Sequence, residues 1–442
     1  MANGEARAQV DLPEERIHRL VSPLLRFMHI EAAGGIALLV FTLAALALAN
    51  SPLSADFLAL WKMKIGFSLG EFEMRYSLRH WINDGLMGIF FFVVGLEVKR
   101  ELVLGELRDP RRAALPFAAA LGGMVVPAAL YLLLMTGTPE ARGWGIPMAT
   151  DIAFAVGCLT IMGTRVPASL RIMLLSLAIV DDIGAILVIA LGYTTGIDLG
   201  MLALGGVGIA AVVLMGKLGV RGEGPYVVVG ALVWFGFHES GVHATIAGVI
   251  LGLMTPARSW VSDHVLQGIV RRAEAVLTGA WGDPSLRHSE LRRVQVAARE
   301  ARSPLERLEG ALHPWVSFAI MPIFAFANAG VPISGGSFGE PVALAVVVGL
   351  VVGKPLGVLL FSWLAVRLGI AALPTGAGWS GVAAVGALAG IGFTMSIFIA
   401  GLALTDASLE AAKIGILSAS LISGVLGIGF ILALLPKPAD RE

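Results

Sequence analysis

Two adjacent aspartates, Asp181 and Asp182, lie in the middle of an apolar segment, residues 174–190, that is long enough to span a bilayer. Each aspartate at the centre of a membrane helix costs roughly 2.5–3.5 kcal/mol on insertion scales, and folding does not require that expense. Neighbouring helical residues point about 100° apart, so one carboxylate can face a cavity while the other faces a second helix. A structural pair neutralised by arginines is the alternative, but the apolar spans contain too few cations. The pair therefore predicts an ion or proton site at membrane depth.

A third aspartate, Asp151, follows Thr150 in a segment that is rich in helix-breaking residues. Gly143, Gly145 and Pro147 precede it and predict a broken helix, because proline removes a donor and glycine tolerates unwinding. Irregular backbone at membrane depth must line a cavity or lie inside protein. The threonine hydroxyl and the carboxylate supply the oxygen ligands that hard cations prefer. The segment therefore predicts part of a site for a small inorganic cation such as sodium.

Lys354 stands near the middle of another apolar span, with about ten apolar positions on either side. A buried ammonium group needs a carboxylate partner or must lose its charge. We therefore expect Lys354 to contact one of the intramembrane aspartates.

A glycine-rich segment, residues 386–396, has glycines at positions 386, 390 and 392. These could form a close-packing face of the kind that membrane helices use. However, the segment occupies the same place in spans 10–12 that the broken span 4 occupies in spans 3–5. Interrupted helices in corresponding places predict a transporter with inverted repeats, two broken, crossing helices, and its site at the bilayer midplane.

The composition of the chain indicates a membrane protein with several spans. The chain is 57% hydrophobic and 14% charged, with a mean hydropathy of +0.82, far from the balance of soluble domains. Apolar runs near the length of a bilayer predict an all-α fold with about twelve spans. The runs cover residues 31–50, 82–98, 112–135, 147–163, 171–194, 199–216, 225–238, 242–257, 314–334, 341–363, 380–403 and 411–435.

The basic residues outside the spans favour one orientation. With twelve spans, they all fall on one side, which the positive-inside rule makes cytoplasmic together with both termini. They are Arg16, Arg19, Arg26, Lys99, Arg100, Arg108, Arg111, Arg112, Arg165, Arg171, Lys217, Arg221 and Arg367. The charged residues of 1–30 indicate a cytoplasmic segment rather than a cleaved signal peptide. The single cysteine, Cys158, excludes an intramolecular disulfide. We expect neither a cofactor nor a nucleic-acid partner.

These features divide the chain into five parts: a cytoplasmic segment 1–30, spans 1–8 over 31–257, a long cytoplasmic loop 258–312, spans 9–12 over 313–435, and a cytoplasmic tail 436–442. Residues 62–80, on the external side, alternate in polarity around Gly70 and predict a small β-hairpin. Its exposed edge could pair with a second protomer or merely cover the loop. Asp283-Pro284 breaks the long loop into two helical pieces, which could form a solvated connector, lie on the membrane surface or close over a cytoplasmic opening.

Several strings of residues resemble the NhaA-type Na+/H+ antiporter family, which is itself one of the examples behind the rule on interrupted helices. The resemblance covers nearly the whole chain, from about Ala33 to the end of span 12. The matching strings are Trp81-Ile-Asn-Asp-Gly-Leu-Met87, Val94-Gly-Leu-Glu-Val-Lys-Arg-Glu-Leu102, Ala149-Thr-Asp-Ile-Ala-Phe154, Ile179-Val-Asp-Asp-Ile-Gly184, Ser240-Gly-Val-His-Ala-Thr-Ile-Ala-Gly248, Leu312-His-Pro-Trp315, Phe324-Ala-Phe-Ala-Asn-Ala-Gly330, Gly353-Lys-Pro-Leu-Gly357 and Gly390-Ile-Gly-Phe-Thr-Met-Ser-Ile-Phe398.

The resemblance implies roles for the intramembrane residues. Asp181 and Asp182 would bind the transported cation and protons, with Asp182 as the more direct ligand, and Thr150 would line the same site. Asp151 and Lys354 would balance the partial charges of the half-helix ends, and Lys354 would pair with Asp181.

The resemblance also implies residues outside this centre, and a physiological setting. Asp84 would lie on the ion path, and residues at or linked to the cytoplasmic mouth would set the pH response: Glu97, Arg100, Glu101, His243 and Glu309. The chain would be a transporter, not an enzyme, in a bacterial inner (plasma) membrane. It would exchange cytoplasmic Na+ or Li+ for external H+, electrogenically and under pH control, as a homodimer joined through the hairpin near Gly70.

One departure and two alternatives stand beside this interpretation. The loop 258–312 is longer than is typical of the family, and Gly310 stands where some relatives have a histidine. The resemblance therefore does not predict the pH at which activity switches on. Symport of another cation or of a small organic ion is the first alternative. Paired membrane aspartates are also found in intramembrane proteases, but those need carboxylates on facing helices. Here they are adjacent on one helix, and the Gly-x-Gly-Asp string of such proteases is absent.

Overall fold

The computed structural model describes residues 31–69, 72–194, 196–279, 284–333, 339–374, 376 and 378–435. The predicted cytoplasmic segment 1–30, the tail 436–442 and Gly70 lie outside these residues. The described chain is mostly helical. Eight of its helical segments are long and apolar enough to cross a membrane, or up to ten if each of two bent helix pairs is one span. The sequence-based count of twelve is larger because it also includes two shorter helices, α10 and α11.

The first half of the chain forms most of the broken and curved spans. Its elements are α2 (Glu31–Ala49), α3 (Ser54–Lys62), β1 (Lys64–Leu69), β2 (Phe72–Ser77), α4 (Leu78–His80), η1 (Trp81–Leu86), α5 (Met87–Val103), η2 (Glu106–Arg108), α6 (Pro110–Leu134), η3 (Pro139–Met148), α7 (Ile152–Ile161), η4 (Gly163–Arg165), α8 (Ala168–Gly192), α9 (Leu199–Lys217), α10 (Glu223–Glu239) and α11 (Ala244–Met254).

The second half continues through a helical loop into the last spans. Its elements are α12 (Asp263–Gly279), α13 (Pro284–Glu300), α14 (Pro304–Trp315), η5 (Val316–Ile320), α15 (Met321–Asn328), α16 (Pro341–Val347), η7 (Val348–Gly353), α17 (Lys354–Arg367), α18 (Trp379–Ala389), α19 (Phe393–Ala403) and α20 (Asp406–Leu434).

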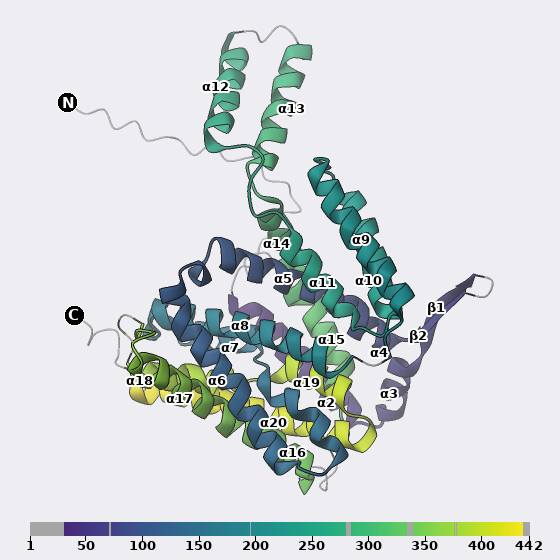
Figure 1. The fold of residues 1–442 in the computed structure, drawn as a ribbon, viewed down its shortest axis with the longest axis vertical. Helices are drawn as coiled ribbons and strands as arrows, with labels where there is room; N and C mark the ends of the chain where they lie inside the picture. Colours follow the sequence, from purple (N-terminus) through teal and green to yellow (C-terminus); the bar gives the residue numbers. More distant parts are fainter. Residues whose placement is uncertain are drawn as a thin grey trace.

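Figure 1 shows a dense helical body, with α9 and α10 standing as an antiparallel pair at one side of it. The helical pair α12 and α13 projects from one end of the molecule, and the strands β1 and β2 project from another edge. The body packs through small residues. A side chain at Gly122 of α6 would collide with the backbone of Gly357 in α17, and the reverse also holds. This close approach, typical of membrane helices, brings α6 against the helix that begins with Lys354.

The predicted hairpin is confirmed. Strands β1 and β2 are antiparallel, with Lys64 opposite Ser77 and Leu69 opposite Phe72. The indole of Trp81, at the start of η1, donates a hydrogen bond to the carbonyl of Ile65 (2.8 Å) and so holds the base of the hairpin to the membrane body.

The long loop contains two helices, as the sequence predicted from the break at Asp283-Pro284. The helix that enters the next span, α14, begins at Pro304, so it includes the last nine residues of the range 258–312. The reason is a capping box: the Ser303 hydroxyl accepts from the Glu306 amide, and the Glu306 carboxylate accepts from the Ser303 amide. These contacts satisfy amide groups that are free in the first turn of a helix. The helix can therefore begin in a polar stretch, before the apolar run.

Candidate functional site

The centre of the body is built from two interrupted helices that cross at their breaks. In the first, η3 ends at Met148 and α7 begins at Ile152, with extended backbone at Ala149 and Asp151. In the second, α18 ends at Ala389 and α19 begins at Phe393, with a bend of 47°. Both predicted breaks are present.

Hydrogen bonds join the two breaks directly. The Asp151 amide donates to the Ile391 carbonyl (2.7 Å), and the Ser396 hydroxyl donates to the Ile146 carbonyl (2.7 Å). Glycine is required in the second break, because a side chain at Gly390 would meet the Leu350 carbonyl oxygen at 2.5 Å. Backbone groups freed by each interruption are therefore satisfied by the other, as membrane depth demands.

Asp151 caps two half-helices at once. One carboxylate oxygen accepts from the Phe154 amide in the first turn of α7 (3.0 Å). The other accepts from the amide of Thr394 in the first turn of α19 (3.1 Å) and from its hydroxyl. Both helix N-termini carry partial positive charge, and one buried carboxylate lies between them. Asp151 thus completes the crossing rather than presenting free oxygens.

Lys354 compensates the negative partial charge at the C-terminal end of a half-helix. Its ammonium group, which is fully buried, donates to the carbonyl of Met148 at the C-terminal end of η3. The same Nζ atom lies 2.6 Å from Oδ2 of Asp181. The contact between Lys354 and an intramembrane aspartate, expected from the sequence, is present. The side chain of Thr150 also donates to Asp181 Oδ2 (2.7 Å) and lies 2.9 Å from the Ala389 carbonyl.

Asp182 differs from its neighbour in having no such partners. Its side chain is only 2% exposed, and its Oδ1 atom has no hydrogen-bond partner among the described residues. Oδ1 of Asp181 is likewise buried and without one. Buried acceptors without donors are rare because each leaves a desolvation penalty unmet. At each of these two carboxylate oxygens, a proton or a hard cation would supply the missing partner.

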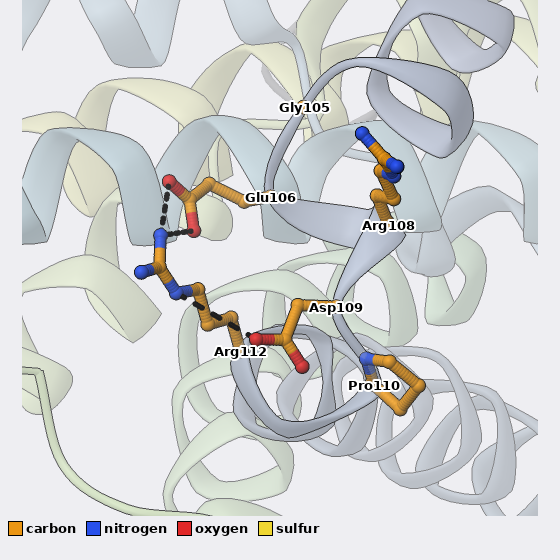
Figure 2. Close-up of a pocket in the computed structure, with 6 residues that line it drawn as sticks. All are labelled: Gly105, Glu106, Arg108, Asp109, Pro110 and Arg112. Atoms are coloured by element: carbon orange, nitrogen blue, oxygen red, sulfur yellow. Dashed lines mark hydrogen bonds and ion pairs between the residues drawn. The ribbon is translucent and has the colours of Figure 1, made fainter.

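Two adjoining pockets open at the start of α6, and the second of them also borders α8. The larger, of about 380 Å³, is lined by Gly105, Glu106, Arg108, Asp109, Pro110 and Arg112. Figure 2 shows Arg112 between the carboxylates of Glu106 and Asp109, and these ion pairs close one side of the pocket. The second pocket, of about 290 Å³, shares Glu106 and Arg112 and reaches Ser176 of α8. Ser176 lies six residues before Asp182, about 9 Å along the helix axis. The pockets therefore approach the aspartate pair from one end.

Four predicted pH-response residues lie near this end. Arg100 forms an ion pair with Glu309, and its guanidinium lies 3.9 Å from Glu101. Glu101 also accepts a hydrogen bond from the Glu106 amide (3.1 Å), and Glu97 lies 3.6 Å from the imidazole of His313.

The structure does not bring His243 or Asp84 into this group. The His243 imidazole contacts the Tyr193 carbonyl (3.1 Å) at the far end of α8. Asp84, in η1, lies beside two histidines near the base of the hairpin, and its carbonyl accepts from the indole of Trp234 (3.0 Å).

Sequence reasoning missed three partners in the site. They are Thr394, which donates to Asp151, the Met148 carbonyl, which accepts from Lys354, and His313, which faces Glu97. Thr394 and His313 stood inside the strings that carried the family resemblance, which was the available signal. Nothing marks a backbone carbonyl such as that of Met148 in a sequence.

Replacing Asp151 with alanine is expected to lower the free energy of unfolding by about 3–9 kcal/mol, because three donors lose their buried acceptor at about 1–3 kcal/mol each. The matched control is Asp198→Ala. Asp198 caps α9 through the Gly200 and Met201 amides at an exposed position, where losing a cap costs about 1 kcal/mol. Unfolding titrations of both variants in detergent micelles measure the difference. Equal losses would contradict the double-capping role of Asp151.

The chain was compared with known proteins. Residues 25–431 match the family model described as Na+/H+ antiporter 1. A relative from Rhizobium meliloti (strain 1021), named Na(+)/H(+) antiporter NhaA, is 54% identical over 434 residues, 97% of this chain and 98% of the relative. Relatives from Rhodopirellula baltica (52% over 434 residues; 98% and 99%) and Acidiphilium cryptum (51% over 427 residues; 96% and 95%) carry the names NhaA and NhaA 2. Motifs, crossing broken helices and these matches agree, and the chain belongs to the NhaA-type Na+/H+ antiporter family.

Proposed function

We propose that this protein exchanges cytoplasmic Na+ or Li+ for external H+ by alternating access at Asp181 and Asp182. The observation that carries the proposal is the pair of buried carboxylate oxygens without partners, set beside two crossing broken helices. Family membership supports antiport as the activity, and transport rather than an enzymatic reaction. A proteolytic mechanism is disfavoured because the carboxylates share one helix and Lys354 is bonded to one of them.

Competition for the same oxygens makes the exchange. Burial away from water disfavours an unpaired charged carboxylate, so each aspartate needs either a proton or a cation. Adjacent sites titrate as a coupled pair. Facing an alkaline cytoplasm, the pair loses protons and binds Na+; facing outward, protons displace the ion. A single site that opens alternately to the two sides couples the two fluxes without a further device.

Three neighbours tune this site. Thr150 supplies a hydroxyl oxygen next to Asp181, and Lys354 holds the shared Oδ2 atom of that residue. Asp182 has no comparable partner among the described residues, so it is the more direct ligand for the ion. Asp151 and Lys354 neutralise the half-helix ends and keep the crossing intact while the ion comes and goes.

The proposed topology has twelve spans, related in part by inverted repeats, in a bacterial inner membrane. Adding α10 and α11 to the ten spans that length and composition allow gives this number. The distribution of basic residues then places both termini and the long loop 258–312 in the cytoplasm. The two pockets at the start of α6 become the cytoplasmic approach to the site.

The remaining assignments follow this topology. Glu97, Arg100, Glu101 and Glu309 form a charged cluster by the cytoplasmic approach and set the pH response. The exchange is electrogenic, with more protons than Na+ ions moved in each cycle. Asp84 lies on the ion path in span 2, and His243 acts on the pH response from outside that cluster. The projecting hairpin, with its free edges, joins two protomers into a homodimer.

The proposal is tested in inside-out vesicles from a strain that lacks its own antiporters, with the acidic lumen reported by acridine orange. Addition of Na+ or Li+ between pH 6.5 and 9 is expected to dequench the dye, and K+ is expected to have no effect. Dequenching by neither Na+ nor Li+ at any pH, with the protein present in the membrane, would contradict the proposal.

A further inference from the structure

A second group of metal-ligating side chains lies outside the proposed ion site, near the base of the hairpin. His80 of α4, Asp84 of η1 and His238 of α10 each offer one ligand atom, and these atoms lie within 4.8 Å of one another. Asp84 Oδ2 is 3.3 Å from Nδ1 of His238 and 3.5 Å from Nε2 of His80. Two helices far apart in the sequence thus contribute to one cluster.

The spacing of these atoms suits a tetrahedral transition-metal ion. Zinc binds histidine nitrogen and carboxylate oxygen at about 2.0–2.2 Å, so neighbouring ligand atoms around it lie about 3.4 Å apart. The two distances at Asp84, 3.3 Å and 3.5 Å, are close to this value. In addition, the Nε2 atom of His80 is buried and has no hydrogen-bond partner among the described residues. A neutral imidazole nitrogen that carries no proton can bind a metal ion through its lone pair.

Surrounding side chains fix the ligands in place. Tyr76 stacks on His80 with ring centroids 4.5 Å apart, and Trp234 stacks on His238 at 5.2 Å. The other imidazole nitrogen of His238, Nε2, faces the Glu239 carboxylate at 3.8 Å. A carboxylate behind a ligating histidine orients the ring and raises its basicity, which is the usual outer arrangement of zinc sites.

We propose that His80, Asp84 and His238 form a binding site for a transition-metal dication of the Zn2+ type. Three protein ligands leave the fourth position of a tetrahedral Zn2+ ion for a water molecule. Two imidazoles and one carboxylate favour Zn2+ over the alkali cations, which take oxygen ligands. This site is therefore chemically distinct from the carboxylate pair at Asp181 and Asp182.

A metal ion here would tie two spans together. His80 and Asp84 lie in the continuous helical segment Leu78–Val103, whereas His238 ends α10. Under the proposed topology the cluster faces the external side, and Asp84 is on the ion path. Bound Zn2+ then holds Asp84 and restrains one span against another, so external Zn2+ slows exchange. This consequence, unlike the binding itself, rests on the proposed function.

Binding is tested on the full-length purified protein after removal of its affinity tag, by calorimetric titration with Zn2+ alone. We expect one Zn2+ per chain, and a Kd weakened at least about tenfold by His238→Gln and by His80→Gln. The control is His264→Gln, an exposed histidine in α12, which is expected to bind as the unmodified protein does. Two ligand variants, His238→Gln and His80→Gln, are used so that the test still holds if one of them misfolds. No binding, or binding that neither substitution weakens, would overturn the proposal.

The effect on transport is measured in proteoliposomes with the hairpin face outward. External Zn2+ is expected to slow Na+/H+ exchange by the unmodified protein and to have little effect on His238→Gln. Exchange that is insensitive to Zn2+, although Zn2+ binds, would overturn the restraint on transport. Absence of exchange in every sample would count against the proposed function and leave the binding result standing.

Discussion

Replacing Asp182 with asparagine is expected to reduce Na+-dependent exchange at least about 100-fold. The substitution keeps the size of the side chain and removes its charge, at a position that is 2% exposed. Removing the charged side of a buried contact, here the carboxylate that would bind Na+, costs roughly 3 kcal/mol or more. This corresponds to about two orders of magnitude in the affinity for Na+. The dequenching assay in inside-out vesicles measures the loss directly.

The matched control for this substitution is Asp198→Asn. Asp198 is exposed and caps α9, and asparagine caps helices about as well as aspartate does. Exchange by this variant should equal that of the unmodified protein. If Asp182→Asn also exchanged Na+ normally, the aspartate pair would not be the transport site.

Replacing Lys354 with alanine is expected to have the second large effect, on stability. The ammonium group is fully buried and bonded to both Asp181 and the Met148 carbonyl, so its removal leaves a buried carboxylate and a helix C-terminus without a cation. Breaking a buried ion pair from one side destabilises a protein by about 3–5 kcal/mol. Unfolding titrations in detergent micelles should show a loss of this size.

A double substitution separates the lost charge partner from lost packing. Lys354→Ala with Asp181→Asn removes both members of the ion pair, so no unpaired charge remains. The double variant should be more stable than the sum of the two single losses predicts, as is usual for groups in direct contact. Strictly additive losses would show that the 2.6 Å contact contributes nothing to stability.

The charged residues proposed for the ion site could be identified from the sequence because a charge at membrane depth is costly. Charged residues are easily recognised in apolar spans that consist mostly of Leu, Val and Ala. They are Asp151, Asp181, Asp182 and Lys354. The hairpin was equally visible, since alternation in polarity is a local property. For these features, neighbouring residues contain the necessary information.

The partners of these residues could not be predicted from the residues themselves. Asp151 meets Thr394, 243 positions away, only because two breaks cross, and the direction of neither helix is written in local sequence. The contact of Asp84 with His238 escaped notice for the same reason, since His238 comes from a distant helix. The helix α14 begins at Pro304, in a polar stretch before the apolar run, because the capping box at Ser303 satisfies its first turn.

The central claim is that Na+ and protons compete for the oxygens of Asp181 and Asp182. It is tested most directly by calorimetric titration of the purified protein with Na+ at alkaline pH, in two buffers whose heats of ionisation differ. The difference in apparent enthalpy gives the number of protons released per Na+ bound. We predict proton release in the unmodified protein and no Na+ binding in Asp182→Asn. Na+ binding with no release of protons would contradict the account.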